Sequence, residues 1–104
     1  MDGASLYVAI WRFRIVPARR DEFLAAYGPR GEWEQLFTRA EGYMGTELFA
    51  TDEADVYLTL DRWRSRQDFA RFQQQFGEEY HALDERCAAL TLEETKLADG
   101  ESVV

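Results

Sequence analysis

The segment from Val56 to Phe76 constrains the fold of this chain more than any other. It begins as an apolar-rich strand and ends that strand at Trp63, and a helix starts at Ser65. Ser65 and Asp68 have the spacing of a capping pair, in which the hydroxyl accepts from a first-turn N–H and the carboxylate reaches back. Aromatic residues then recur at helical spacing, at Phe69, Phe72 and Phe76. The pattern therefore predicts a strand that leads directly into a helix with an aromatic face.

The chain before this segment predicts one strand, two short helices and a second strand. Residues 6–15 alternate, and both faces are apolar over most of that length. Pro17 suits the first turn of a helix that Gly28-Pro29 ends, and a second helical stripe runs from Trp33 to Ala40. A strand follows over residues 43–51, and the short polar connection at 52–55 predicts a hairpin with the next strand.

The C-terminal part predicts a long helix and a weak last strand. The apolar stripe continues through Tyr80, Leu83, Cys87 and Leu90, and Gly77 indicates either a break between two helices or a kink. Residues 92–97 predict a strand. We therefore expect one domain over residues 1–97 and a frayed tail over residues 98–104.

Composition excludes several classes of protein. The formal net charge is -8, which disfavours a general attraction to nucleic acid or an anionic membrane. No apolar run approaches the roughly 20 residues of a membrane span, and no secretory signal precedes the first strand, so we expect a cytoplasmic protein. The lone Cys87 leaves no partner for an internal disulfide and no multi-thiolate metal site.

The predicted order β–α–α–β–β–α–β is a ferredoxin-like α+β arrangement, a four-stranded antiparallel sheet with its helices on one face. The other face would carry Leu6, Val8 and Ile10 together with one face of the second and third strands. Several hundred Å² of exposed apolar surface would forgo on the order of 10 kcal/mol. Pairing with the same face of a second copy solves this problem, so the sequence predicts a homodimer through the open sheet face.

Two groups of residues are candidates for chemistry. His81 has Glu78, Asp84 and Glu85 at helical spacing, and it is interpreted as a pocket base or ligand, as a metal half-site with Glu78, or as a surface histidine. The second group is aromatic, and it forms either a packed core or the wall of an apolar cavity that binds an aromatic small molecule. Its members are Tyr7, Trp11, Phe13, Trp33, Tyr43, Trp63, Phe72 and Tyr80.

The Gly42-Tyr43-x-Gly45 segment and the Trp63-Arg64-Ser65 junction resemble those of the antibiotic biosynthesis monooxygenase family, over about residues 6–97. The resemblance implies two ferredoxin-like sheets paired as a dimeric α/β barrel. It also implies a monooxygenase, independent of metal or flavin, that oxidises a phenolic, polyketide or quinol-type compound with O₂ between sheet and helices. By position His81 would be the catalytic base, with Trp63, Tyr43 or Tyr80 as lining or hydrogen-bond donors.

A haem-degrading branch of the same superfamily uses an Asn on the first strand and a Trp and a His on the long helix. Only His81 matches, because Trp11 stands at the Asn position and Phe72 at the Trp position. The resemblance therefore implies no cofactor and no metal site. The alternatives are a non-catalytic dimer that binds a small ligand or haem, and a structural dimer whose cavity is filled by aromatic side chains.

Overall fold

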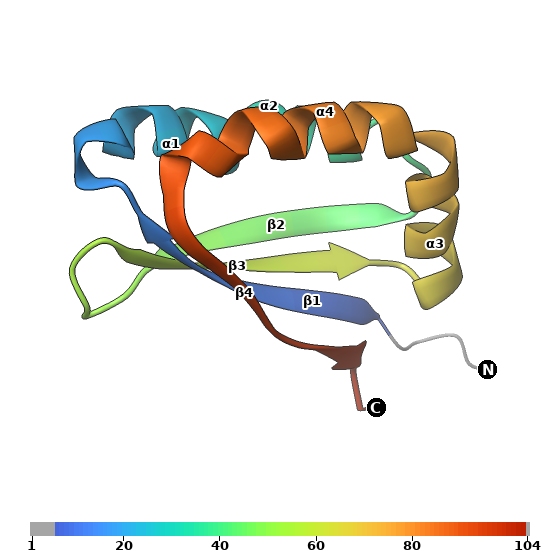
Figure 1. Ribbon diagram of the computed structural model, residues 1–104. Coiled ribbons are helices and arrows are strands. Elements are labelled where there is room, and N and C mark those ends of the chain that lie inside the picture. The colour runs from blue at the N-terminus through green and yellow to red at the C-terminus, as the bar shows by residue number, and fades with distance from the viewer. Residues whose placement is uncertain (1–5, 104) are drawn as a thin grey trace.

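The computed structural model describes residues 6–103, and these form one antiparallel sheet covered on one face by helices (Figure 1). The four strands are β1 (Tyr7–Ile15), β2 (Tyr43–Ala50), β3 (Val56–Trp63) and β4 (Thr91–Glu101), in the order β2-β3-β1-β4. The helices are α1 (Arg20–Tyr27), α2 (Glu32–Phe37), α3 (Arg66–Gln75) and α4 (Gly77–Cys87). Short 3₁₀ turns, η1 (Pro17–Arg19) and η2 (Ala88–Leu90), precede α1 and follow α4. The predicted ferredoxin-like α+β fold is confirmed.

Strand β1 alternates between the two faces of the sheet, as its sequence predicts. Tyr7, Ala9, Phe13 and Ile15 are buried beneath the helices. The aromatic side chains of this face pack on those of the helices, and Phe13 lies 5.7 Å from Phe23 and 4.8 Å from Tyr27 between ring centroids. The opposite register carries Val8 and Ile10, which remain half-buried in the single chain. The core thus lies between the sheet and the helix layer.

The strand-to-helix junction at Trp63 is built as predicted, with one difference. The Ser65 hydroxyl accepts from the Asp68 N–H at 3.1 Å and caps α3. The Asp68 carboxylate accepts hydrogen bonds from Arg64 at 2.7 Å and from Arg71 at 2.6 Å rather than reaching back to the cap. Two arginines offer charge-assisted bonds, which are stronger than one bond to a neutral backbone N–H.

Of the two alternatives at Gly77, the break between two helices is confirmed. The helix ends at Phe76 and Gly77 begins a separate one, and Figure 1 shows α3 crossing the end of the sheet while α4 runs along its face. The C-terminal segment differs from the sequence-based expectation. Strand β4 extends beyond residue 97 to Glu101, so the expected tail at 98–104 is wrong over its first residues. They pair with β1 at Ala98↔Ile10 and Glu101↔Tyr7. Across residues 6–103, no helix combines the length and apolar character needed to span a membrane.

Candidate functional site

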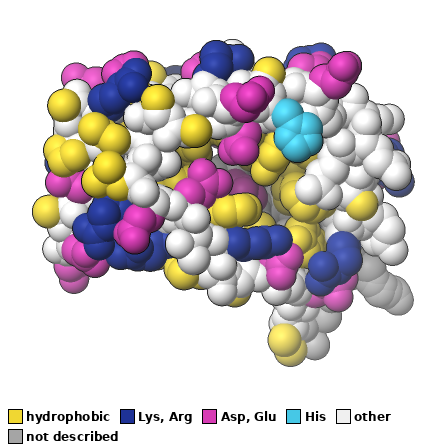
Figure 2. Space-filling model, viewed as in Figure 1, with side chains coloured by type: hydrophobic (Ala, Val, Ile, Leu, Met, Phe, Trp, Pro, Cys, Tyr) yellow, Lys and Arg dark blue, Asp and Glu magenta, His cyan; other side chains and the backbone are white. Residues whose placement is uncertain are grey.

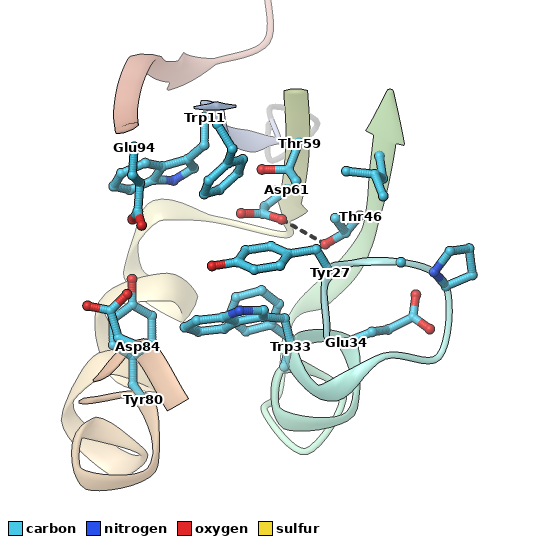
Figure 3. A pocket seen from close by; sticks show the side chains of 15 residues that line it. Trp11, Tyr27, Trp33, Glu34, Thr46, Thr59, Asp61, Tyr80, Asp84 and Glu94 are labelled. Carbon is cyan, nitrogen blue, oxygen red and sulfur yellow. Dashed lines mark hydrogen bonds between the residues drawn. The ribbon is translucent and has the colours of Figure 1, made fainter. Parts of the chain in front are cut away.

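A cavity of about 60 Å³ lies between the sheet and the helices and opens on the face shown in Figure 2. All four strands, α1, α2 and α4 contribute side chains to it. Its walls are mainly aromatic, and several carboxylates and hydroxyls enter it (Figure 3). The lining residues are Trp11, Phe13, Tyr27, Gly28, Pro29, Trp33, Glu34, Phe37, Thr46, Leu48, Thr59, Asp61, Tyr80, Asp84 and Glu94. The volume is well below the roughly 300 Å³ of a typical ligand pocket, so it encloses a single ring or a small head group.

Asp61 reaches the cavity because β3 alternates in register with its neighbours. Trp63, Asp61 and Thr59 share the face beneath the helices, and Asp61 lies opposite Thr46 on β2 and Ala9 on β1. The Thr46 hydroxyl donates to Asp61 Oδ1 at 2.7 Å. Burial raises the pKa of Asp61 to about 6, and the Thr46 hydrogen bond opposes that rise. Asp61 is therefore a carboxylate near neutral pH with a raised proton affinity, as a general base requires.

The hydroxyl groups around Asp61 remain protonated at neutral pH. Tyr43 lies behind Thr46, with its hydroxyl 2.6 Å from the Thr46 hydroxyl. Burial raises the pKa of Tyr43 to about 12 and that of Tyr80 to about 12. The charges of Asp84, Glu94 and Asp61 add to the rise at Tyr80. Tyr80 can therefore donate a hydrogen bond in the cavity but does not act as a base there.

Trp33 forms one wall of the cavity and carries a buried N–H. Its ring stands 5.8 Å from Tyr27 and 5.2 Å from Tyr80 between centroids. Only 8% of Trp33 is exposed, and its Nε1 has no hydrogen-bond partner within residues 6–103. A buried donor without a partner costs free energy, so this N–H is available to an oxygen atom of a bound molecule.

The structure divides the predicted aromatic set in two. Trp11, Phe13, Trp33 and Tyr80 line the cavity. The other four belong to the adjoining core, where Trp63 is 0% exposed and Phe72 is 1% exposed. They are Tyr7, Tyr43, Trp63 and Phe72. Cavity and packed core are therefore both present, in adjacent parts of one aromatic layer.

His81 lies outside the cavity. Its side chain is exposed on α4, and Figure 2 shows this single histidine on the surface near the hollow. Its ring lies 5.9 Å from that of Tyr80, which does enter the cavity. The cavity does not fit a haem, because its volume is far smaller than a porphyrin and it has no histidine among its lining residues. Within residues 6–103, no three acidic, histidine or cysteine side chains are arranged to hold a metal ion.

Sequence reasoning missed Asp61, Thr46 and Thr59. Asp61 read as the polar end of an apolar strand, although its spacing from Trp63 places both on the buried face. An acidic residue in the core-facing register was the signal that could have found it, since buried carboxylates are rare without a partner or a role.

A family model for antibiotic biosynthesis monooxygenase matches residues 6–86 of the chain. Two similar solved structures are proposed antibiotic biosynthesis monooxygenases. The protein from Nitrosomonas europaea has 18% identity and a TM-score of 0.74, with 94% of this chain and 90% of that chain covered. The Bordetella bronchiseptica protein has 19% identity and a TM-score of 0.75, with 96% and 99% covered.

A third similar structure is SnoaB from Streptomyces nogalater, described as a cofactor-independent oxygenase. It has 20% identity and a TM-score of 0.67, with 97% of this chain and 94% of that chain covered. At such identities these likenesses establish the fold alone. Comparison with curated protein sequences gives no significant match.

Proposed function

Because this chain belongs to the antibiotic biosynthesis monooxygenase family, we propose that it is a cofactor-independent monooxygenase of a phenolic or quinol compound. Family membership places it among monooxygenase-type proteins, and the similarity to SnoaB supports the cofactor-independent reaction. The observation that carries the proposal is the Asp61 carboxylate, held in an aromatic cavity with its pKa raised to about 6. The cavity volume favours a single ring over a fused polyketide.

In the proposed reaction Asp61 takes the proton from the phenolic hydroxyl of the substrate. The resulting phenolate is electron-rich, and it passes one electron to O₂ to give a phenoxyl radical and superoxide. These combine at the ring carbon para to the oxygen, so that a C–O bond forms and Asp61 returns its proton to the peroxide. The protein contributes a base and a dry, shaped site, and the substrate itself supplies the electrons.

The second half of the reaction breaks the O–O bond. Asp61 removes the hydrogen of the oxygenated ring carbon, a second C=O forms, and the departing hydroxide takes that proton and leaves as water. One oxygen atom of O₂ is then in the quinone and the other is in water. The phenol has lost four electrons, which equals the full reduction of O₂.

Donors in the cavity would stabilise the negative charge that develops in these steps. The Trp33 N–H has no hydrogen-bond partner in the described part of the chain, and Tyr80 keeps its proton because its pKa is about 12. Both residues line the same cavity as Asp61. Preorganised donors in a site of low dielectric contribute strongly to catalysis, so we propose this role for Trp33 and Tyr80.

His81 remains the competing candidate for the catalytic base. The family resemblance assigns the base to His81, but this residue is exposed and does not line the cavity. Its exposed side chain supports Asp61 as the base instead. The small cavity also favours a second function, a non-catalytic dimer that binds a small aromatic ligand, and the test below separates the two.

We also propose a cytoplasmic homodimer that pairs through the open sheet face. Val8, Ile10, Leu58 and Leu60 are half-buried on that face, and Ile10 and Leu60 lie side by side in register. Phe49, opposite Leu58, is 44% exposed. A second copy would cover this apolar surface by two-fold symmetry.

The test is oxygen uptake by purified protein dialysed against a chelator, with single-ring phenols and hydroquinones as substrates and naphthols and anthrones for comparison. With ¹⁸O₂ and a monohydric phenol, we expect one labelled oxygen in the quinone product. Saturable ligand binding without oxygen uptake would replace the proposed enzyme with a binding protein.

A further inference from the structure

The walls of the cavity carry four acidic side chains. Glu34, Asp61, Asp84 and Glu94 line it, and none of the lining residues in the described part of the chain is Lys, Arg or His. Several surface carboxylates pair with arginine, as at Arg14–Glu93 and Arg86–Glu32. Within residues 6–103, none of the four cavity acids forms such an ion pair.

Three of these acids lie at two ends of the cavity. Figure 3 shows Asp84 and Glu94 beside Tyr80 at one end, and Asp61 with Thr46 and Thr59 at the other. Asp84 and Glu94 influence each other, because the pKa of Glu94 is raised by partial burial and by the charge of Asp84. Two neighbouring carboxylates of like charge would be relieved by a cation between them.

Aromatic faces complete the surroundings of this acidic end. Trp11, Tyr27, Trp33 and Tyr80 contribute rings to the same cavity. Trp11 already has an internal cation near its ring, since Lys96 Nζ lies 6.0 Å from the ring centroid. Aromatic faces together with carboxylates are the chemistry that recognises ammonium groups.

The cation that fits this site is organic. The acids are not gathered as metal ligands within residues 6–103, and the walls between them are aromatic. A second feature concerns the other end of the ligand. The buried Trp33 N–H lies near the Tyr27 hydroxyl and the Cys87 thiol but has no hydrogen-bond partner within residues 6–103, so an oxygen acceptor of a bound molecule would satisfy it. A ligand with a positive group at one end and an oxygen at the other satisfies both features.

We infer that the cavity selects a single-ring phenol that carries an ammonium group on a short chain. The ammonium group would lie between Asp84 and Glu94 against the aromatic faces, and the phenolic oxygen would lie toward Asp61 and the Trp33 N–H. That such a phenol is the substrate rests on the proposed monooxygenase function. That such a phenol binds rests only on the charges and the aromatic walls of the cavity.

The experiment compares three phenols of similar size by calorimetry at pH 7.5 and low salt. The probes are tyramine, which is cationic, tyrosol, which is neutral, and 4-hydroxyphenylacetate, which is anionic. We expect tyramine to bind at least about tenfold more tightly than tyrosol and the anion to bind most weakly. Equal affinities for tyramine and tyrosol would overturn the inference.

Variants of the two acids test whether the preference for the cationic phenol arises at this end of the cavity. Glu94→Gln and Asp84→Asn should each reduce the preference for tyramine over tyrosol, measured as the ratio of their dissociation constants, by roughly tenfold. Glu93→Gln and Glu85→Gln are matched controls, because each lies next in sequence to a cavity acid, is exposed and is not part of the lining. A preference that survives both cavity variants would contradict this site.

Oxygen uptake with the meta isomers of these probes separates this inference from the proposed function, because in them the ring carbon para to the phenolic oxygen carries the hydrogen that the reaction removes. Tight tyramine binding that depends on Glu94, with no oxygen uptake from meta-tyramine or from other phenols with a free para position, would uphold the cation site and reject the monooxygenase. Turnover of neutral phenols, without tighter binding of tyramine than of tyrosol, would support the monooxygenase and reject the cation site.

Discussion

Thr46 on β2 donates its hydroxyl hydrogen to the carboxylate of Asp61 on β3, across 2.7 Å. The two residues are paired in register across the sheet, so the bond depends on the alignment of the two strands. It opposes the effect of burial on the pKa of Asp61. The Thr46–Asp61 pair thus sets both the position and the charge of the proposed base.

Asp61 should reduce the stability of the fold at neutral pH. For a carboxyl whose pKa rises from 3.8 to about 6 on folding, stability is highest below pH 4 and falls as the pH rises to about 6. The full loss would be about 3 kcal/mol. Because the carboxylate opens onto the cavity, we expect Asp61→Asn to gain about 1–2 kcal/mol at pH 7 and nothing at pH 4. Urea unfolding at both pH values checks this, and an equal gain at pH 4 would exclude the ionisation as its cause.

Removal of the Thr46 hydroxyl should shift the pH dependence of the reaction. Activity requires ionised Asp61, so the rate should fall as the pH drops below about 6. Thr46→Val removes a hydrogen bond to the carboxylate, raises the pKa of Asp61 and moves this acid limb upward in pH. Thr46→Ser keeps the hydroxyl and should leave the limb in place. The measurement is the pH–rate profile of both variants from pH 4.5 to 8. If the acid limb of Thr46→Val lay at the same pH as that of Thr46→Ser, the hydrogen bond would have no influence on the pKa of Asp61.

Gly42 should be required for the packing of the strand-to-helix junction. Its φ is +93°, and a β-carbon there would lie 2.5 Å from the carboxyl group of Asp68. Asp68 is only 3% exposed and is held by Arg64 and Arg71, so it cannot move aside freely. We expect Gly42→Ala to cost about 2–4 kcal/mol.

Two other glycines serve as controls for this prediction. At Gly45 the φ is +127° but the surrounding space is open, so Gly45→Ala should cost about 1 kcal/mol. Gly77 begins α4 with open space around it, so Gly77→Ala should be neutral or stabilising. Thermal unfolding of the three variants tests this ranking, and equal losses at all three would reject the role of the Asp68 contact.

The open sheet face should form the dimer. Val8→Asp or Leu58→Asp would bury a charge without a partner at the interface, which costs several kcal/mol and should give a monomer or an unfolded chain. Leu24→Asp is the control, because Leu24 is 37% exposed on α1, on the other layer of the molecule. Light scattering after gel filtration measures the outcome, and an unchanged dimer in Val8→Asp and Leu58→Asp would reject this face as the interface.

The sequence predicted the fold because its strongest patterns are local. Alternation in residues 6–15 and the cap at Ser65 act within a few residues and are present in the structure. The end of β4 was missed because residues 98–101 are stabilised by pairing with β1, which lies far away in the sequence. Their own composition, rich in Asp, Gly and Glu, does not favour a strand.

The candidate site was less predictable, for a geometric reason. The sequence predicts His81 as a site residue because of its chemistry, but the buried stripe of α4 passes through Leu83 and Cys87 and leaves His81 exposed. It does not single out Asp61, although the spacing from Trp63 places Asp61 on the buried face of β3. Which aromatic residues enclose a cavity and which pack solidly depends on how helices and sheet meet, and no local pattern encodes that.

The most direct measurement is oxygen uptake by the wild-type protein, Asp61→Asn and His81→Ala with one active phenol at pH 7.5. We predict that Asp61→Asn lowers the rate by at least about 100-fold, because the general base is lost, and that His81→Ala retains most of the activity. A fully active Asp61→Asn variant beside an inactive, folded His81→Ala variant would contradict the account and return the catalytic role to His81.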